Sequence, residues 1–171
     1  IGQNPGTNHP RMPEPLREAA KRGAQVVCFN PLKERGLERF QHPQHPFEML
    51  SNGSEPTSSA YFRPALGGDM AAMRGIAKFL LQWEREAQAN GEPAVFDHAF
   101  IAEHTSGVDD YLAAVDATSW AHIVKQSGLT LAEIELAARM YRKAERVIMC
   151  WAMGVTQHRH SVPTVQEIVN L

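Results

Sequence analysis

Cysteine is scarce in this chain of 171 residues, which contains only Cys28 and Cys150. Each cysteine lies within an apolar run, and no Cys-x-x-Cys motif occurs. A disulfide framework, a zinc knuckle and an iron–sulfur cluster held by this chain alone are therefore excluded. Buried free thiols indicate a reducing compartment, so we expect a cytoplasmic protein.

The chain also lacks an excess of charge of one sign and a long apolar run. Its formal net charge is −2 at pH 7, so no overall basic field favours nucleic acid or acidic lipid. No apolar stretch approaches about 20 residues, so no membrane span is predicted. The start has no basic segment followed by an apolar one, which argues against a signal peptide. The hydrophobic fraction of 43% is that of an ordinary globular domain.

Periodicity predicts helices that alternate with short strands. Apolar runs rich in β-branched residues predict buried parallel strands over residues 25–29 and 146–151. Amphipathic spacing and end signals predict longer helices over residues 15–22, 70–90 and 131–144. Thr130 and Glu133 form a capping-box pattern before the last of these. The alternation predicts an α/β fold, a three-layer Rossmann-like domain with a mostly parallel sheet flanked by helices.

One domain is expected over residues 1–171, with an irregular loop at 36–58 that is rich in proline, glycine and polar residues. The loop is longer than most connections, which favours a packing or functional role. It contains His42 and His45, but no cysteine or carboxylate cluster accompanies them. We therefore predict no metal site in this chain.

Four turns of small or polar residues follow or open the predicted strands, over residues 3–9, 29–33, 66–69 and 153–157. Ligands of parallel α/β sheets bind at the carboxyl ends of the strands, so these turns should meet. Their glycines allow close backbone approach, and helix N-termini present N–H groups to phosphate oxygens. We expect a phosphorylated or nucleotide-like ligand there. Asp69 is suited to accept from the N–H pair of a guanine.

Two motifs near the ends of the chain resemble segments of the molybdopterin oxidoreductases, the dimethyl sulfoxide reductase superfamily. Residues 2–10, Gly-Gln-Asn-Pro-Gly-Thr-Asn-His-Pro, resemble the Gly-x-Asn-Pro-x-x-x-His-Pro turn of that family. Residues 151–157, Trp-Ala-Met-Gly-Val-Thr-Gln, resemble the Trp-Gly-Met-Gly-Val-Thr-Gln segment of formate dehydrogenase catalytic subunits. Residues 97–101 and 131–141 match in order and spacing, so the resemblance covers essentially the whole chain.

The resemblance implies an internal piece of a larger catalytic subunit, truncated at both ends. This piece would hold one guanine-dinucleotide arm of bis-molybdopterin guanine dinucleotide, the molybdenum cofactor of the intact enzyme. The implied cofactor-binding residues are Asn4, Thr7 and Asn8 at the phosphates and ribose, Phe29 and Asn30 at the guanosine, Gly68 and Asp69 at the guanine, and Met153, Gly154 and Gln157 near the pterin.

The resemblance also implies what this chain lacks. In the family, the molybdenum ligand and any iron–sulfur cluster lie upstream of the opening turn, and the catalytic arginine of formate oxidation lies downstream of the final helix. We therefore expect no catalytic residue here, and an inactive isolated chain. The strand that normally precedes such an opening turn is also absent, so we expect an unpaired edge or slot in the sheet.

Two positions depart from the family pattern, since Asn30 stands where Asp is common and Leu32 where Arg is common. An uncharged Asn30 binds a ribose hydroxyl less strongly than a carboxylate does. A cofactor-free regulatory or interaction module of the same fold thus remains an alternative. An NAD-binding domain is another, although neither Gly-x-Gly-x-x-Gly nor a Walker motif is present. After Gln157, His158 and Arg159 are candidates for the pterin entrance and a phosphate, or exposed loop residues. The resemblance specifies no redox partner.

Overall fold

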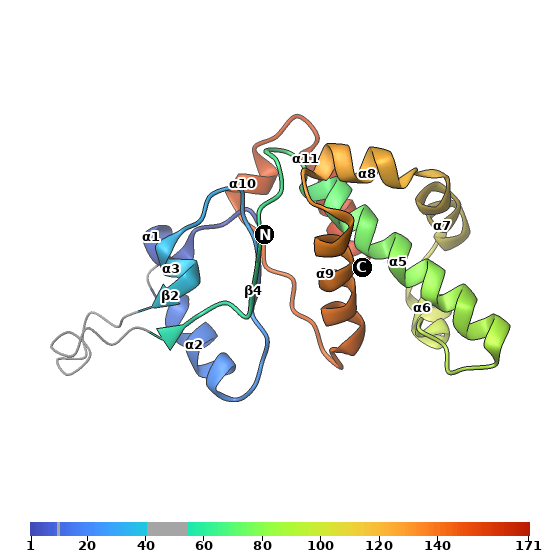
Figure 1. Cartoon of the computed structure of the whole chain (residues 1–171), viewed down its shortest axis with the longest axis horizontal. Coiled ribbons are helices and arrows are strands. Elements are labelled where there is room, and N and C mark those ends of the chain that lie inside the picture. Colours follow the sequence, from blue (N-terminus) through green and yellow to red (C-terminus); the bar gives the residue numbers. More distant parts are fainter. Residues whose placement is uncertain (10, 41–54) are drawn as a thin grey trace, which may run out of the picture.

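The computed structural model describes residues 1–9, 11–40 and 55–171 (Figure 1). Most of the loop predicted over 36–58, with His42 and His45, lies outside these residues, as does Pro10 of the opening motif. The described ends of the loop contain α3 (Arg35–Glu38) and a short antiparallel pair, β2 (Arg39–Phe40) with β3 (Glu55–Pro56). Part of this region is therefore more regular than the sequence predicted.

The parallel sheet is much smaller than predicted. β1 (Val27–Phe29) pairs in parallel with β4 (Ala60–Phe62), and Phe29 lies opposite Phe62. The strand predicted over 146–151 is absent, because that segment has no ladder of hydrogen bonds to a neighbouring strand among the described residues. The described chain is mostly helical around this small parallel pair. The parallel pair with its helices fits an α/β class, but the described residues form no three-layer Rossmann-like sheet.

Prolines open the two N-terminal helices, α1 (Pro5–Asn8) and α2 (Pro13–Lys21). Proline suits the first helical turn, where a missing N–H leaves no internal hydrogen bond unmade. The helix predicted over 15–22 is thus confirmed and begins two residues earlier. It ends before Gly23, whose φ of +92° reverses the chain direction at little steric cost.

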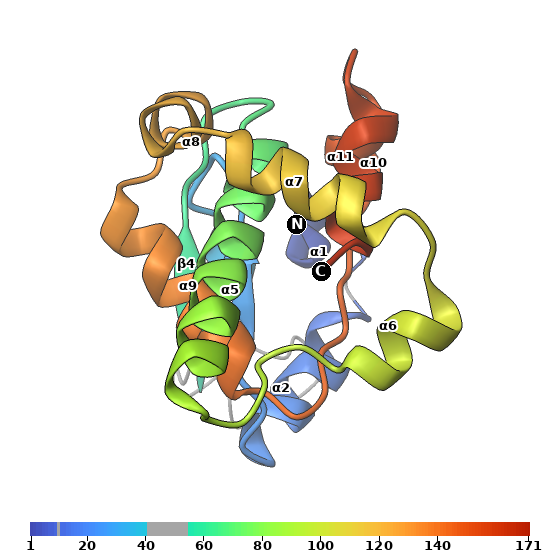
Figure 2. The same ribbon diagram turned by 90° about the vertical axis from the view of Figure 1, so that its right-hand side faces the viewer.

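The helix predicted over 70–90 is confirmed as α5 (Asp69–Asn90), which is the centre of the fold. It packs against α8 (Trp120–Ser127), α9 (Leu131–Lys143) and α11 (Ser161–Val169) (Figure 2). The remaining helices are α6 (His98–His104), α7 (Val108–Ala117) and α10 (Met153–Thr156). Within the described ranges, no helix combines the length and apolarity that crossing a bilayer requires.

Local signals explain where several helices begin. In the capping box before α9, Thr130 Oγ1 accepts from the Glu133 N–H at 3.2 Å, and Glu133 Oε2 accepts from the Thr130 N–H at 2.8 Å. Asp97 caps α6 by accepting from the Phe100 N–H at 3.0 Å. Each cap satisfies backbone donors that the first helical turn leaves unpaired.

The core lies between one face of the strand pair and the helices. Phe29 and Phe62 pack with their ring centroids 5.0 Å apart. They join Met73 of α5 and Ile134 of α9 in a single buried cluster. Because side chains alternate along a strand, Val27, Phe29, Ala60 and Phe62 share this face, while Cys28 and Tyr61 point to the other.

A partly buried ion pair joins α5 to α11. Arg74 donates from Nε and from Nη2 to the two carboxylate oxygens of Glu167, each at 2.6 Å. The Tyr111 hydroxyl of α7 donates to the same carboxylate at 2.8 Å. Burial, together with this negative charge, raises the pKa of Tyr111 above its usual range, so the hydroxyl keeps its proton. Three helices are therefore held by one carboxylate.

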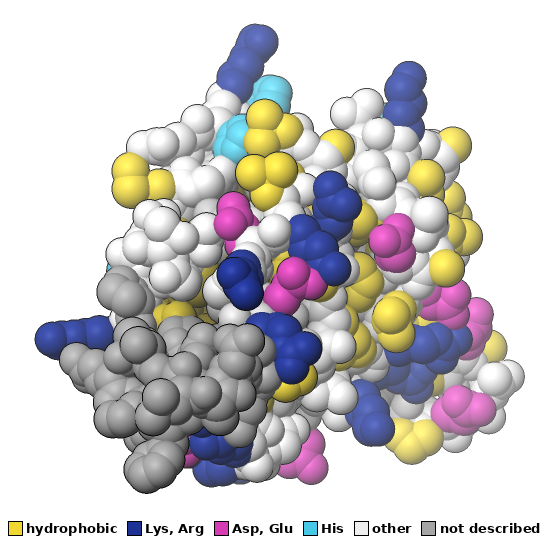
Figure 3. Space-filling view, turned by 60° about the vertical axis from the view of Figure 1, so that its left-hand side comes forward, with side chains coloured by type: hydrophobic (Ala, Val, Ile, Leu, Met, Phe, Trp, Pro, Cys, Tyr) yellow, Lys and Arg dark blue, Asp and Glu magenta, His cyan; other side chains and the backbone are white. Residues whose placement is uncertain are grey.

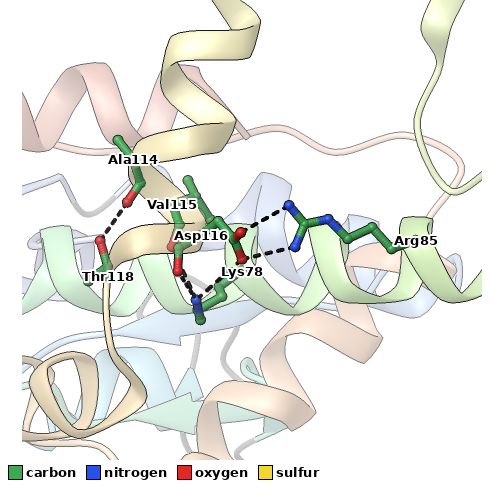
Figure 4. Close-up of polar contacts among 6 residues, drawn as sticks. All are labelled: Lys78, Arg85, Ala114, Val115, Asp116 and Thr118. Carbon is green, nitrogen blue, oxygen red and sulfur yellow. Dashed lines mark hydrogen bonds and ion pairs between the residues drawn. The ribbon is translucent and has the colours of Figure 1, made fainter.

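Lys78 caps the C-terminal end of α7 from inside the protein (Figure 4). Its ammonium group is buried and donates to the carbonyl oxygens of Val115 at 3.3 Å and Asp116 at 2.6 Å. Asp116 in turn accepts two hydrogen bonds from the exposed guanidinium of Arg85. The last carbonyls of a helix lack internal partners, so a cation placed there is stabilising.

We predict that Lys78→Met lowers the free energy of unfolding by about 2 kcal/mol, because the carbonyls of Val115 and Asp116 lose a charged donor. The matched variant Arg85→Met breaks only an exposed ion pair with Asp116 and should have a much smaller effect. Urea denaturation of the three proteins measures the difference. Equal losses for both variants would contradict a capping role for Lys78.

Glu84 organises the chain between α5 and α6. Glu84 is 2% exposed. Its carboxylate accepts hydrogen bonds from the N–H groups of Val95 at 2.6 Å and Phe96 at 3.0 Å. Gln88 donates at 2.7 Å and the His98 Nε2 lies 2.8 Å away. Burial alone would raise the pKa of Glu84, but these hydrogen bonds outweigh it and lower the pKa from 4.5 to about 2.

A carboxyl whose pKa is lowered by folding stabilises the protein above its ordinary pKa and stops doing so as the pH falls. We therefore predict that the contribution of Glu84 is complete above about pH 4.5 and is lost between pH 4.5 and about 2. Glu84→Gln should remove about 2 kcal/mol at pH 7 and flatten this acid limb. Thermal unfolding across pH 2 to 7 checks this. An unchanged acid limb in Glu84→Gln would refute it.

Candidate functional site

Backbone hydrogen bonds bring the opening turn to the carboxyl edge of the strand pair. The Gly2 N–H donates to the Phe29 carbonyl at 3.1 Å. One strand further on, the Asn30 N–H donates to the Phe62 carbonyl at 3.1 Å. The turns that follow residues 2, 29 and 62 therefore leave the sheet at the same edge, where parallel α/β folds bind ligands.

The turn before α10 reaches the same edge through a close approach of two glycines. Gly2 adopts a φ of +57°, and a Cβ there would lie 2.6 Å from Val155 Cγ2. A Cβ on Gly154 would overlap the carbonyl oxygen of Gly2. Figure 1 shows α10 beside the N-terminus and the upper end of β4. The motifs at the two ends of the sequence thus form one structural unit.

A cavity of about 260 Å³ opens between the start of α5 and the chain that joins α10 to α11. Its lining residues are Leu66, Gly67, Asp69, Val155, His158, Arg159, His160 and Thr164. In Figure 3, histidine and hydrophobic side chains gather at the upper end of one face, below a projecting basic side chain. The cavity combines apolar walls, one carboxylate and basic groups, a composition typical of small-molecule sites.

Asp69 is the most unusual group in this cavity. The residue is 6% exposed, and its Oδ1 is buried without a hydrogen-bond partner among the described residues. Burial raises the pKa of Asp69, while its own backbone N–H and the nearby His158 act in the opposite direction. Native proteins rarely leave such an acceptor unpaired, so Asp69 is a candidate ligand contact.

Asn4 shows the same feature on the opening turn. Its Nδ2 donates to Thr7 Oγ1 at 3.2 Å, but its Oδ1 is buried and has no hydrogen-bond partner in the described part of the chain. Beside it, α1 packs tightly on α3, since a Cβ on Gly6 would lie 2.8 Å from the Gly36 Cα. Thr7 and Asn8 are exposed, so the polar side of this turn is open.

Two predicted guanosine contacts have structural partners of their own. Phe29 is buried in the core against Phe62, so mainly its backbone reaches the candidate site. Asn30 is 9% exposed and donates from Nδ2 to the Leu32 carbonyl at 2.7 Å, which closes the turn after β1. Leu32 itself is exposed. The structure thus gives Asn30 a local role that its place in the motif did not suggest.

Of the remaining predicted residues, Gly68 is packed against another helix, whereas Met153 and Gln157 lie on the surface. A Cβ on Gly68 would lie 2.8 Å from the carbonyl oxygens of Gln126 and Ser127, so this glycine lets α5 begin against the end of α8. Met153, the first residue of α10, and Gln157, which follows its last residue, are both exposed. Thr164, which no sequence motif singled out, lines the cavity, and its hydroxyl donates to the His160 carbonyl at 2.8 Å. The only sequence signal for Thr164 was its position in the first turn of the helix that follows His158.

In the described ranges, no group of three or more histidine, cysteine, aspartate or glutamate side chains is arranged to hold a metal ion. His158 and His160 line the cavity, so they lie near the other candidate contacts. Cys28 is buried, as predicted, but Cys150 is exposed, which corrects the expectation for that residue.

Comparison with known proteins agrees with the resemblance of the two end motifs. No protein-family model matches the chain. The chain is 47% identical over its whole length to Protein YdeP of Escherichia coli and 38% identical over 99% of its length to an uncharacterized oxidoreductase of Mycobacterium tuberculosis. It is 26% identical over its whole length to formate dehydrogenase H of Escherichia coli. The chain therefore resembles one part of larger oxidoreductases.

The aligned region is a small share of each relative. The chain spans 22% of Protein YdeP, 21% of the mycobacterial oxidoreductase and 20% of formate dehydrogenase H. The resemblance to formate dehydrogenase-like oxidoreductases is thus confirmed for a segment of about a fifth of their length.

We predict that Gly154→Ala lowers the free energy of unfolding by about 3 kcal/mol, because the new methyl group meets backbone that cannot move aside easily. Gly107→Ala is the matched control, since that glycine has a φ of +72° and open space around it. Its backbone strain should cost about 1 kcal/mol. Urea denaturation compares the two variants. A loss for Gly154→Ala no larger than that for Gly107→Ala would exclude the close approach to Gly2.

Proposed function

We propose that this chain is the part of a formate dehydrogenase-like molybdenum oxidoreductase that holds the guanine-dinucleotide arm of bis-molybdopterin guanine dinucleotide. The observation that carries the proposal is a pair of buried oxygens without partners, Oδ1 of Asn4 and Oδ1 of Asp69. Both belong to turns at one edge of the fold, and a ligand that donates to them would satisfy both. The similarity to proteins named formate dehydrogenase supports the cofactor class.

Asp69 fits the role of guanine acceptor. A guanine ring presents an N–H and an amino group side by side, and a carboxylate can accept from both. Leu66 and Val155 of the cavity wall supply apolar surface for the faces of the base. An adenine ring lacks this donor pair, so Asp69 would distinguish guanine from adenine.

Cationic and neutral donors near Asp69 and Asn4 fit the remainder of the arm. Arg159 is exposed at the rim of the cavity and suits a diphosphate, since a guanidinium can bond two oxygens at once. His158 adds a ring nitrogen on the same side. On the opening turn, Oδ1 of Asn4 is suited to accept from a ribose hydroxyl, and the hydroxyl of Thr7 is suited to donate to a phosphate oxygen.

The bound cofactor would supply the two-electron chemistry at molybdenum. The residues of this chain would bind and orient it, and we assign the metal ligand and any iron–sulfur cluster to other parts of the protein. We infer that the isolated chain binds nucleotide without catalysing a redox reaction. Substrate and redox partner would be determined elsewhere in the protein.

Calorimetric titration with GDP, ADP and NADH tests the proposal. We predict that GDP binds more tightly than ADP or NADH. Asp69→Asn should weaken GDP binding by about 10-fold or more, because an amide has one neutral acceptor oxygen where the carboxylate has two charged ones. Asp69→Asn should also raise the unfolding midpoint by about 2–4 °C, since it removes a buried carboxylate whose Oδ1 has no hydrogen-bond partner among the described residues. Asp110→Asn, the same change at an exposed site of α7, is the control.

The two readouts separate loss of a contact from loss of structure. Weaker binding with a lowered midpoint would mean that Asp69→Asn damages the fold. Tighter binding of NADH than of GDP would favour an NAD-binding domain. No binding of any of the three at millimolar concentration would favour a cofactor-free module.

A further inference from the structure

The hydroxyl of Tyr61 in β4 joins the sheet to the turn between β1 and α3. It donates to the Leu32 carbonyl at 2.6 Å and accepts from the Glu34 N–H at 3.1 Å. The side-chain amide of Asn30 donates to the same hydroxyl oxygen at 3.4 Å and to the Leu32 carbonyl at 2.7 Å. Tyr61 therefore uses its one donor and both of its acceptor positions on a single turn.

This turn determines where α3 begins. Glu34 is the residue before the first turn of α3, so the bond from its N–H to Tyr61 holds that end of the helix. The other end is held by backbone, since the Glu38 carbonyl accepts from the Thr57 N–H at 2.9 Å. The ion pair of Lys33 with Glu38 is exposed and lies within one segment, so it cannot tie α3 to the sheet. Tyr61 is therefore the side chain through which β4 sets the start of α3.

Helix α3 in turn packs closely on α1 (Figure 1). A Cβ on Gly6 would lie 2.8 Å from the Gly36 Cα and 3.7 Å from Asn4 Oδ1. The Asn4 oxygen that lacks a hydrogen-bond partner among the described residues thus lies beside this contact. The Asn4 carbonyl also accepts from the Asn8 N–H at 3.1 Å, so Asn4 belongs to the start of α1. Asn4 is therefore placed by α1, and α1 is placed by α3.

We propose that Tyr61 is a positioning residue of the nucleotide site and that it acts through α3 on Asn4. Its hydroxyl fixes the turn over residues 30–34, this turn places α3, and α3 places the Asn4 oxygen that accepts from a ribose hydroxyl. The nature of the ligand rests on the proposed function. The path from Tyr61 to Asn4 rests on the hydrogen bonds and the close contact of α3 with α1.

Tyr61→Phe separates the hydroxyl from the packing of the ring. The ring stays, while the Leu32 carbonyl and the Glu34 N–H lose their link to β4 and bond to water instead. We therefore expect a small loss of stability and a start of α3 that is less firmly placed. A change in ligand binding that follows from this loss would come from position, because Tyr61 itself contacts no ligand in the proposed site.

A double-mutant cycle, measured by titration with GDP, tests the path. We predict that Tyr61→Phe weakens GDP binding by about 5-fold, the effect of one net hydrogen bond. In an Asn4→Ala background the same change should have no further effect, because the oxygen that Tyr61 positions is gone. In an Asp69→Asn background it should keep its full effect, because Asp69 is placed by α5.

Tyr111→Phe is the matched control for the loss of a tyrosine hydroxyl. The Tyr111 hydroxyl donates to Glu167 at 2.8 Å in the helical half of the protein. Its removal should lower the unfolding midpoint without changing GDP affinity in any of the three backgrounds. If Tyr61 had only a structural role, Tyr61→Phe would behave in the same way as this control, and the inference would be overturned.

NMR spectra of the free protein test the path without nucleotide. Tyr61→Phe should shift the resonances of Gly6, Gly36 and the Asn4 side-chain amide, whereas Tyr111→Phe should leave all three in place. Unshifted resonances, or additive losses of GDP affinity for Tyr61→Phe and Asn4→Ala, would contradict the inference. If the three resonances shift but GDP binds to no variant and not to the wild-type protein, the path from Tyr61 to Asn4 stands and the proposed ligand is wrong.

Discussion

The candidate site depends on the close approach of Gly2 to Gly154 and Val155. These residues are about 150 positions apart in sequence, and their backbones meet without room for a side chain. Once they meet, the opening turn and the turn before α10 must leave the fold at one edge, together with the ends of β1 and β4. Two motifs that are separate in sequence therefore act on the same ligand space.

The helical half of the protein holds Asp69 in an unfavourable environment. α5 begins at Asp69 and is anchored along its length by Arg74, Lys78 and Glu84, each of which makes buried or partly buried polar contacts with another segment. A buried carboxylate with one oxygen that lacks a hydrogen-bond partner among the described residues costs stability, and a rigid helix prevents it from relaxing toward water. Such a strained arrangement is common where a ligand completes the hydrogen bonds.

The helices and their caps could be predicted from sequence because their signals are local. The amphipathic period of α5 and the capping box of Thr130 and Glu133 act within a few residues. The predicted strand over 146–151 was wrong for this chain, because a strand exists only with a hydrogen-bonded neighbour. The cavity was likewise beyond prediction, since His160 and Thr164 meet Asp69 only through tertiary packing. The turn closed by Asn30 also had no distinctive sequence signal.

The opening turn links the folding of the protein to the candidate site. Gly2 is held by Phe29 on one side and, through Ile1, by Cys150 on the other. Asn4 follows two residues later, so the position of its unpaired oxygen depends on how firmly Gly2 is held. Helix α5, which begins at Asp69, is fixed by its own contacts with other segments and does not depend on Gly2. The Asn4 side of the site therefore depends on contacts between segments far apart in sequence, whereas the Asp69 side depends on the packing of α5.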